Sequence, residues 1–167
     1  MHKEPTETGV IRLESVEEFV EYSAELIKPA LRSVTILTPD MERLWLGAEL
    51  VVDSIKLGIV KNRRLQVRLL VADPTLAIRT GHPLLGLIKK LSRFEARVIS
   101  KEMQEKQPLT TSMILVDRGG VVVRQSGDNF IGFCHFDDKH TVKNLNADFD
   151  QYWRYSETHA DLRYFSI

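Results

Sequence analysis

Several features are scarce or missing in this sequence of 167 residues, and each absence excludes a class of protein. Cys134 is the only cysteine, so the chain can form neither an internal disulfide nor a cysteine-rich zinc site. No apolar run approaches the roughly 18 residues that span a bilayer. The first residues also lack the apolar core of a secretory signal. We therefore expect a cytoplasmic protein with no transmembrane segment.

The chain also lacks an excess of either charge. Lys plus Arg and Asp plus Glu both number 23, which gives a formal net charge of zero. Neutrality argues against a general nucleic-acid coat, although a local basic groove stays possible. Hydrophobic content of 43% and charged content of 28% are ordinary for a globular protein. We expect a lead-in over residues 1–14 and a single domain over 15–167, which is long enough to bury roughly two thirds of its unfolded surface.

Hydrophobic spacing predicts an alternation of helices and strands. Ser15 and Glu18 form a capping box, which indicates that a helix begins there. The polar stretch Lys101–Pro108 is expected to be a mobile loop. Apolar periodicity predicts further helices over 48–59, 84–91 and 142–156, and strands over 33–38, 65–71, 94–99, 113–116, 121–125 and 130–134.

This order predicts an α/β fold. Strands that alternate with helices in the first half imply parallel pairing through right-handed crossovers. The segment Thr110–Gln125 then reads as two apolar strands about Gly119-Gly120, which adds an antiparallel hairpin. We expect a mixed, mainly parallel β-sheet with helices on both faces.

The hairpin and the residues after it resemble a known motif. The phospholipase D superfamily carries His-x-Lys-x4-Asp followed by a small segment with Gly and Asn. Aligned on Asp117, this chain reads Thr110-x-Ser112-x4-Asp117, and Asn129 closes a Ser-Gly-Asp-Asn segment two or three residues too far on. Phe149-Asp-Gln-Tyr-Trp153 is similar to the closing helix of the family. The element order and these residues resemble one half of that superfamily.

The departures from this motif bear on function. The resemblance implies a role for each motif residue of the family. The histidine takes the phosphoryl group, the lysine neutralises phosphate oxygens and the aspartate hydrogen-bonds a histidine. Covalent transfer needs a nucleophile that can attack and later leave, and Thr110 has a hydroxyl of very high pKa. Ser112 carries no positive charge to stabilise the transition state. We therefore expect no catalytic residue and interpret the chain as a pseudoenzyme.

A second polar cluster precedes a predicted helix. Arg79, Thr80 and His82 come just before Pro83, which suits a first helical position. Free amides at a helix start favour anions, and such loops lie where α/β sheets usually bind ligands. These three residues are our candidates for a phosphate or acidic-ligand site, with an ordinary capped loop as the alternative.

The remaining reactive residues suggest neither metal nor cofactor. The segment His135–His140 holds two histidines and two aspartates, but their spacing matches no established zinc or iron pattern. Cys134 lies in an apolar strand and reads as a small buried hydrophobe. Trp45 could line a ligand cleft or cap the core.

Three functions remain open. The first is a non-catalytic phospholipase D-like module that binds a phosphorylated or anionic ligand, nucleic acid or a partner protein. The second is a structural domain for dimerisation, because one superfamily half usually meets another. The third is a phosphodiesterase with altered residues, in which His82 acts as the base.

Overall fold

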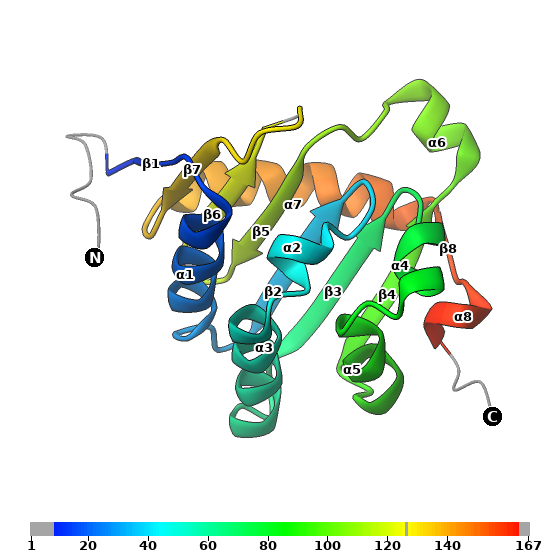
Figure 1. Ribbon diagram of the computed structural model, residues 1–167, viewed down its shortest axis with the longest axis horizontal. Coiled ribbons are helices and arrows are strands. Elements are labelled where there is room, and N and C mark those ends of the chain that lie inside the picture. Colours follow the sequence, from blue (N-terminus) through cyan, green and yellow to red (C-terminus); the bar gives the residue numbers. More distant parts are fainter. Residues whose placement is uncertain (1–8, 126, 164–167) are drawn as a thin grey trace.

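The computed structural model describes residues 9–125 and 127–163 and contains one sheet with helices on both faces (Figure 1). The strands are β1 Ile11–Leu13, β2 Ser33–Thr38, β3 Gln66–Val71, β4 Phe94–Ile99, β5 Ser112–Val116, β6 Gly120–Arg124, β7 Gly132–His135 and β8 Ser156–Glu157. The helices are α1 Val16–Ile27, α2 Arg43–Leu46, α3 Glu49–Lys61, α4 Thr75–Thr80, α5 Leu84–Lys90, α6 Lys101–Lys106, α7 Lys139–Arg154 and α8 Ala160–Arg163.

The sheet is mixed, but it is not mainly parallel as the sequence predicted. Its strand order is β1-β7-β6-β5-β2-β3-β4-β8. Only β2, β3 and β4 pair in parallel in the described chain, and every other pairing is antiparallel. The prediction failed because β5 enters beside β2 in the opposite direction and brings β6, β7 and β1 with it. The parallel βαβ units thus form one side of the sheet only.

The segment expected as a lead-in contributes a strand. Ile11–Leu13 pairs with β7 at the edge of the sheet, and the side chains of Ile11 and Leu13 are buried. Residues 1–8 lie outside the described residues. The sequence missed this strand because three residues are too few to show an alternating pattern.

Each face of the sheet buries its own hydrophobic core. Helices α1 to α5 cover one face and pack on side chains such as Val34, Ile36 and Ile114. Helix α7 runs behind the other face in Figure 1, where Phe149 packs with Leu37 and Leu115. Two covered faces explain why most strands read as continuous apolar runs and not as alternating ones.

The helix starts follow ordinary capping chemistry. The Ser15 Oγ accepts the Glu18 amide at 3.2 Å, as predicted, and the Glu18 carboxylate accepts the amide of Glu14, one residue before the cap, at 2.9 Å. Ser100 caps α6 in the same way, through the Met103 amide at 3.2 Å. The prediction of a mobile loop over Lys101–Pro108 was therefore wrong. It overlooked the cap and the buried side chain of Met103.

The sheet has two ends that matter for function. We call the end where β2, β3 and β4 finish the carboxyl edge, and the end where they begin the amino edge; these lie at the top and the bottom of Figure 1. Because β5 is antiparallel to β2, it begins with Ser112 at the carboxyl edge, and Asp117 lies just past its other end, at the amino edge. None of the helices in the described part of the chain is long and apolar enough to cross a bilayer.

Candidate functional site

Three polar side chains meet at the carboxyl edge because of strand alternation. Side chains two residues apart share a face, so Ser112 lies on the face of Ile114 and Arg124 on that of Val122, which both belong to the core under α1 to α5. Thr38 shares this face with Ile36. Ser112 and Arg124 are direct partners in the β5–β6 register. We call this group, together with Met41 and Glu42, the Ser112 corner.

Hydrogen bonds join the corner into a chain. The Met41 amide donates to Thr38 Oγ1 at 3.2 Å, and the Thr38 and Ser112 hydroxyls are 2.9 Å apart, so that either can donate to the other. The Glu42 carboxylate comes next, close enough to the Ser112 hydroxyl that this hydroxyl lowers its pKa.

Glu42 and Arg124 form a buried ion pair at the end of this chain. Their side chains are only 8% and 15% exposed, and Arg124 Nη1 bonds Glu42 Oε1. Burial raises the pKa of the Glu42 carboxyl, and the Ser112 hydrogen bond and Arg124 oppose that rise. The Arg124 guanidinium also donates to the carbonyls of Gly127 and Asn129 and lies 4.3 Å from the centre of the Phe130 ring.

Neither member of this pair was predicted from the sequence. One signal was available for Arg124: in Val-Val-Val-Arg it occupies a core-facing position of an apolar strand. A charged residue there requires a partner. No pattern indicated Glu42 as that partner, because the two residues are 82 positions apart.

His82 holds the bend that carries Glu42. Met41 and Glu42 have φ of 74° and 29°, which side-chain-bearing residues rarely adopt. His82 Nδ1 accepts the Leu84 amide at 3.1 Å, so its Nε2 carries the proton and donates to the Met41 carbonyl at 2.8 Å. Burial lowers the pKa of His82 and keeps the ring neutral. Both ring nitrogens are thus engaged in holding backbone.

The four positions of the degenerate motif do not meet. Thr110 is exposed just before β5, whereas Ser112 is buried in the corner. Asp117 lies at the opposite edge, where its carboxylate accepts the amides of Leu31 and Ser33 at 3.2 and 3.4 Å. Asn129 is exposed and reaches the corner only through its backbone carbonyl. In the turn beside Asp117, Gly119 has a positive φ of 92°, while Gly120 already belongs to β6.

The predicted anion site is divided between surface and interior. Arg79 and Thr80 are exposed at the end of α4, whereas His82 is buried. The Leu84 amide expected to be free for a ligand is taken by His82 Nδ1. The Thr80 hydroxyl donates to the Leu76 carbonyl at 2.8 Å, and Arg43 Nη1 donates to the Thr80 carbonyl at 2.7 Å. An anion-binding role of Arg79 stays a prediction.

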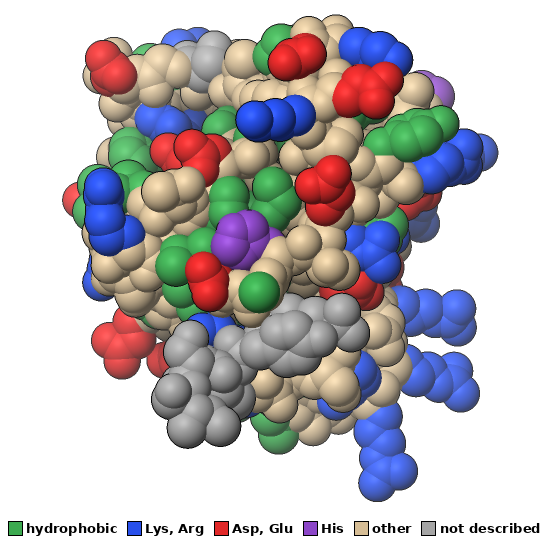
Figure 2. Space-filling view, turned by 90° about the vertical axis from the view of Figure 1, so that its right-hand side faces the viewer, with side chains coloured by type: hydrophobic (Ala, Val, Ile, Leu, Met, Phe, Trp, Pro, Cys, Tyr) green, Lys and Arg blue, Asp and Glu red, His purple; other side chains and the backbone are tan. Residues whose placement is uncertain are grey.

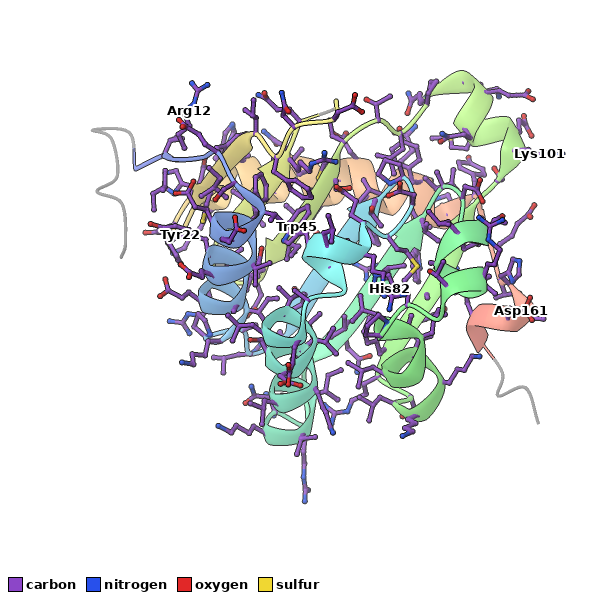
Figure 3. The ribbon with its side chains drawn as sticks, viewed as in Figure 1. Arg12, Tyr22, Trp45, His82, Lys101 and Asp161 are labelled. Atoms are coloured by element: carbon purple, nitrogen blue, oxygen red, sulfur yellow. The ribbon has the colours of Figure 1, made fainter. Side chains whose placement is uncertain are left out.

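The other reactive residues lie in the core or apart from one another. Burial raises the pKa of Cys134 to about 12, so its thiol stays protonated and unreactive. Trp45 is fully buried against Phe19, and its indole N–H donates to Ser23 Oγ at 2.8 Å. Figure 3 shows Trp45 and His82 among the elements on the side of α1 to α5. No three His, Cys, Asp or Glu side chains of the described chain gather as metal ligands would.

The Ser112 corner has little capacity for phosphoryl chemistry. Ser112 lies beside a carboxylate, and its side chain is buried and cannot reach a substrate. The one cation of the ion pair already neutralises a resident carboxylate, and that carboxylate would repel a phosphate. The corner therefore joins β2, β5 and β6 and does not present an open reactive group.

Sequence comparison assigns a family. A family described as a domain of unknown function (DUF7931) matches residues 15–165. The chain belongs to this family. No protein with a curated description matches the sequence.

Comparison of folds finds phospholipase D-like structures. TrmBL2, an archaeal chromatin protein whose structure shows a mode of DNA binding, matches with a TM-score of 0.66 at 15% identity. The match covers 90% of this chain and 54% of TrmBL2, so the chain spans about half of that protein. NucT from Helicobacter pylori matches at 0.62 and 10% identity over 90% and 98% of the two chains. Nuc from Salmonella typhimurium, a phospholipase D family member, matches at 0.60 and 13% over 93% and 99%. This member of the DUF7931 family has a phospholipase D-like fold.

Proposed function

We propose that the chain is a non-catalytic phospholipase D-like domain that binds an anionic, phosphate-bearing ligand without cleaving it. The observation that carries the proposal is the Ser112 corner. A buried serine stands at the lysine position of the motif, beside the Glu42 carboxylate that Arg124 neutralises. With a carboxylate resident where phosphate charge must be stabilised, the corner disfavours the transition state of the family reaction.

Anion binding without chemistry fits the rest of the molecule. Similarity to a chromatin protein that binds DNA supports a nucleic-acid ligand. The predicted anion-binding residue Arg79 is exposed at the carboxyl edge. A reducing, cytoplasmic setting suits a chain whose one cysteine is buried.

The test has a catalytic arm and a binding arm. We expect no turnover of bis(p-nitrophenyl) phosphate, and no difference between wild type and Ser112→Ala. We expect wild type to bind short oligonucleotides or anionic vesicles, with Arg79→Ala as the variant that tests the predicted cluster. Turnover that disappears in Ser112→Ala would overturn the non-catalytic reading, and absence of binding to both probes would overturn the binding role.

Exposed leucines at the carboxyl edge favour dimerisation as a second candidate function. Leu44 on α2 and Leu76 on α4 are 70% and 51% exposed, and Arg43 joins these two helices through the Thr80 carbonyl. Exposed apolar side chains on neighbouring elements are typical of a contact surface. We expect static light scattering to report a dimer that Leu44→Ser with Leu76→Ser dissociates. A monomeric wild type would exclude this candidate.

A further inference from the structure

The cations of this neutral chain are concentrated at the amino edge. The turns there, residues 28–33, 61–66, 89–94, 117–120 and 136–139, hold three acidic residues. Two of these are engaged with backbone: Asp117 accepts the Leu31 and Ser33 amides, and Asp138 caps α7. The exposed cations of the same turns, which we call the amino-edge cations, are Lys28, Arg32, Lys61, Arg63, Arg64, Lys90, Arg118 and Lys139.

The carboxyl edge shows no such excess. Its connecting segments, residues 39–43, 72–82, 100–111 and 124–131, hold five cations and six acidic residues. Figure 2 shows Lys and Arg side chains projecting together from the lower part of the molecule, the end at which the amino edge lies in Figure 1. Charge is thus segregated along the strands, although the net charge is zero.

Backbone hydrogen bonds hold these turns side by side. The Arg32 carbonyl accepts the Gln66 amide at 2.9 Å, and the Arg93 carbonyl accepts the Val67 amide at 2.8 Å. At the other side, the Gly119 carbonyl accepts the Asp138 amide at 2.8 Å. The turns lie at the ends of the adjacent strands β5, β2, β3 and β4. At the usual strand spacing, the cations therefore extend over roughly 14 Å across the sheet.

A hollow with an exposed aromatic ring lies within this surface. It has a volume of about 750 Å³, and its lining includes Leu31, Phe136, the three cations Arg32, Arg118 and Lys139, and the carboxylates of Asp117 and Asp137. Phe136 is 39% exposed and Leu31 48%. The ring of Phe136 is tilted against that of Tyr22, with 6.2 Å between their centres, which braces it in place. An exposed ring among cations is the arrangement that stacks a base and contacts its phosphates.

We propose that the amino edge binds single-stranded nucleic acid, with a base stacked on Phe136 and the phosphates running along the amino-edge cations. This inference rests on the proposed function and gives it a ligand class and a surface, remote from the Ser112 corner. A duplex keeps its bases stacked and cannot offer one to Phe136. A membrane surface is flat and does not fill a hollow, so both are poorer occupants.

Fluorescence anisotropy with labelled 15-nucleotide strands of DNA and RNA tests the proposal. Phe136→Ala is expected to weaken binding by about fivefold to a hundredfold, with little change in the salt dependence. Arg118→Gln is expected to weaken binding and to lower the slope of log K against log salt by about 1. Circular dichroism checks that both variants fold.

Two double variants with equal changes of charge compare the two edges. At the amino edge, Arg63→Glu with Arg64→Glu is expected to weaken binding strongly. At the carboxyl edge, Lys101→Glu with Lys106→Glu is the matched control and is expected to leave binding unchanged. Equal effects of the two pairs, unaltered affinity in Phe136→Ala, or tighter binding of duplex or anionic vesicles would overturn the inference. Wild-type binding that survives every amino-edge change would leave the proposed function standing, whereas a wild type that binds neither strands nor vesicles would remove both.

Discussion

The ion pair of Glu42 and Arg124 joins three strands at one corner and leaves some polar atoms unsatisfied. Glu42 Oε2 and Arg124 Nε are buried without a hydrogen-bond partner. Buried pairs of this kind recover only part of the free energy that desolvation costs. Removal of one partner should therefore destabilise the protein more than replacement of both partners with uncharged side chains.

We expect Arg124→Met to lower the free energy of unfolding by about 3–5 kcal/mol, because it leaves a buried carboxylate without its cation. Adding Glu42→Gln should recover much of that loss, since no charge then remains. Urea unfolding at pH 7 measures both. Lys106→Met, which breaks the exposed pair with Glu102, is the control and should cost at most about 1 kcal/mol. A double variant as unstable as the single one would contradict this account.

His82 should make stability depend on pH. Burial lowers its folded-state pKa below the ordinary 6.5, so the unfolded chain takes up the proton first as the pH falls. Stability supplied by neutral His82 is then present above pH 6.5 and is lost on acidification toward the lowered pKa. The difference in unfolding free energy between wild type and His82→Gln should shrink from pH 7.5 to pH 5. A constant difference would show that His82 takes up its proton equally in the folded and the unfolded state.

At this scale, the sequence identified positions better than it identified contacts. It singled out Ser112 and Asp117 through their place in a motif, and it gave Trp45 a core role as one alternative. It missed Glu42 and Arg124 because their pairing depends on the register of three strands. It also could not show that His82 is turned inward, since a histidine in a loop reads the same whether it holds backbone or faces a ligand.

The short strand β1 precedes residue 15, where the domain was expected to start. Leu13 is fully buried, so Leu13→Ala removes core contacts and leaves a cavity. We expect a loss of about 2–5 kcal/mol in urea unfolding. Arg12→Ala, at the intervening exposed position, should change stability by no more than about 0.5 kcal/mol. Similar effects of the two substitutions would mean that β1 adds nothing to the core.

Long amphipathic elements were predictable, and short ones were not. The helices α1, α3, α5 and α7 and the strands from β2 to β7 all follow the apolar spacing of the sequence. The short helices α2, α4 and α6 have four to six residues each, too few for a period of 3.6 to repeat. Strand direction was the larger error, because apolar runs reveal burial on two faces but not which neighbour a strand pairs with.

Viewed as a whole, the molecule has zero net charge and a strong separation of charge. We therefore expect the protein to bind a heparin column at pH 7 despite its balanced composition. Arg63→Glu with Arg64→Glu should elute at clearly lower salt than Lys101→Glu with Lys106→Glu, although both variants have the same formal charge. Identical elution would show that net charge alone decides retention.

The closed corner also means that two substitutions would not create a working site. A histidine and a lysine installed at Thr110 and Ser112 would reproduce the phospholipase D motif. The new ammonium group, however, would be captured by the carboxylate of Glu42, and that carboxylate is fixed by a bend that His82 secures from another loop. A phosphodiesterase designed on this scaffold would first require the removal of the Glu42 carboxylate from the corner.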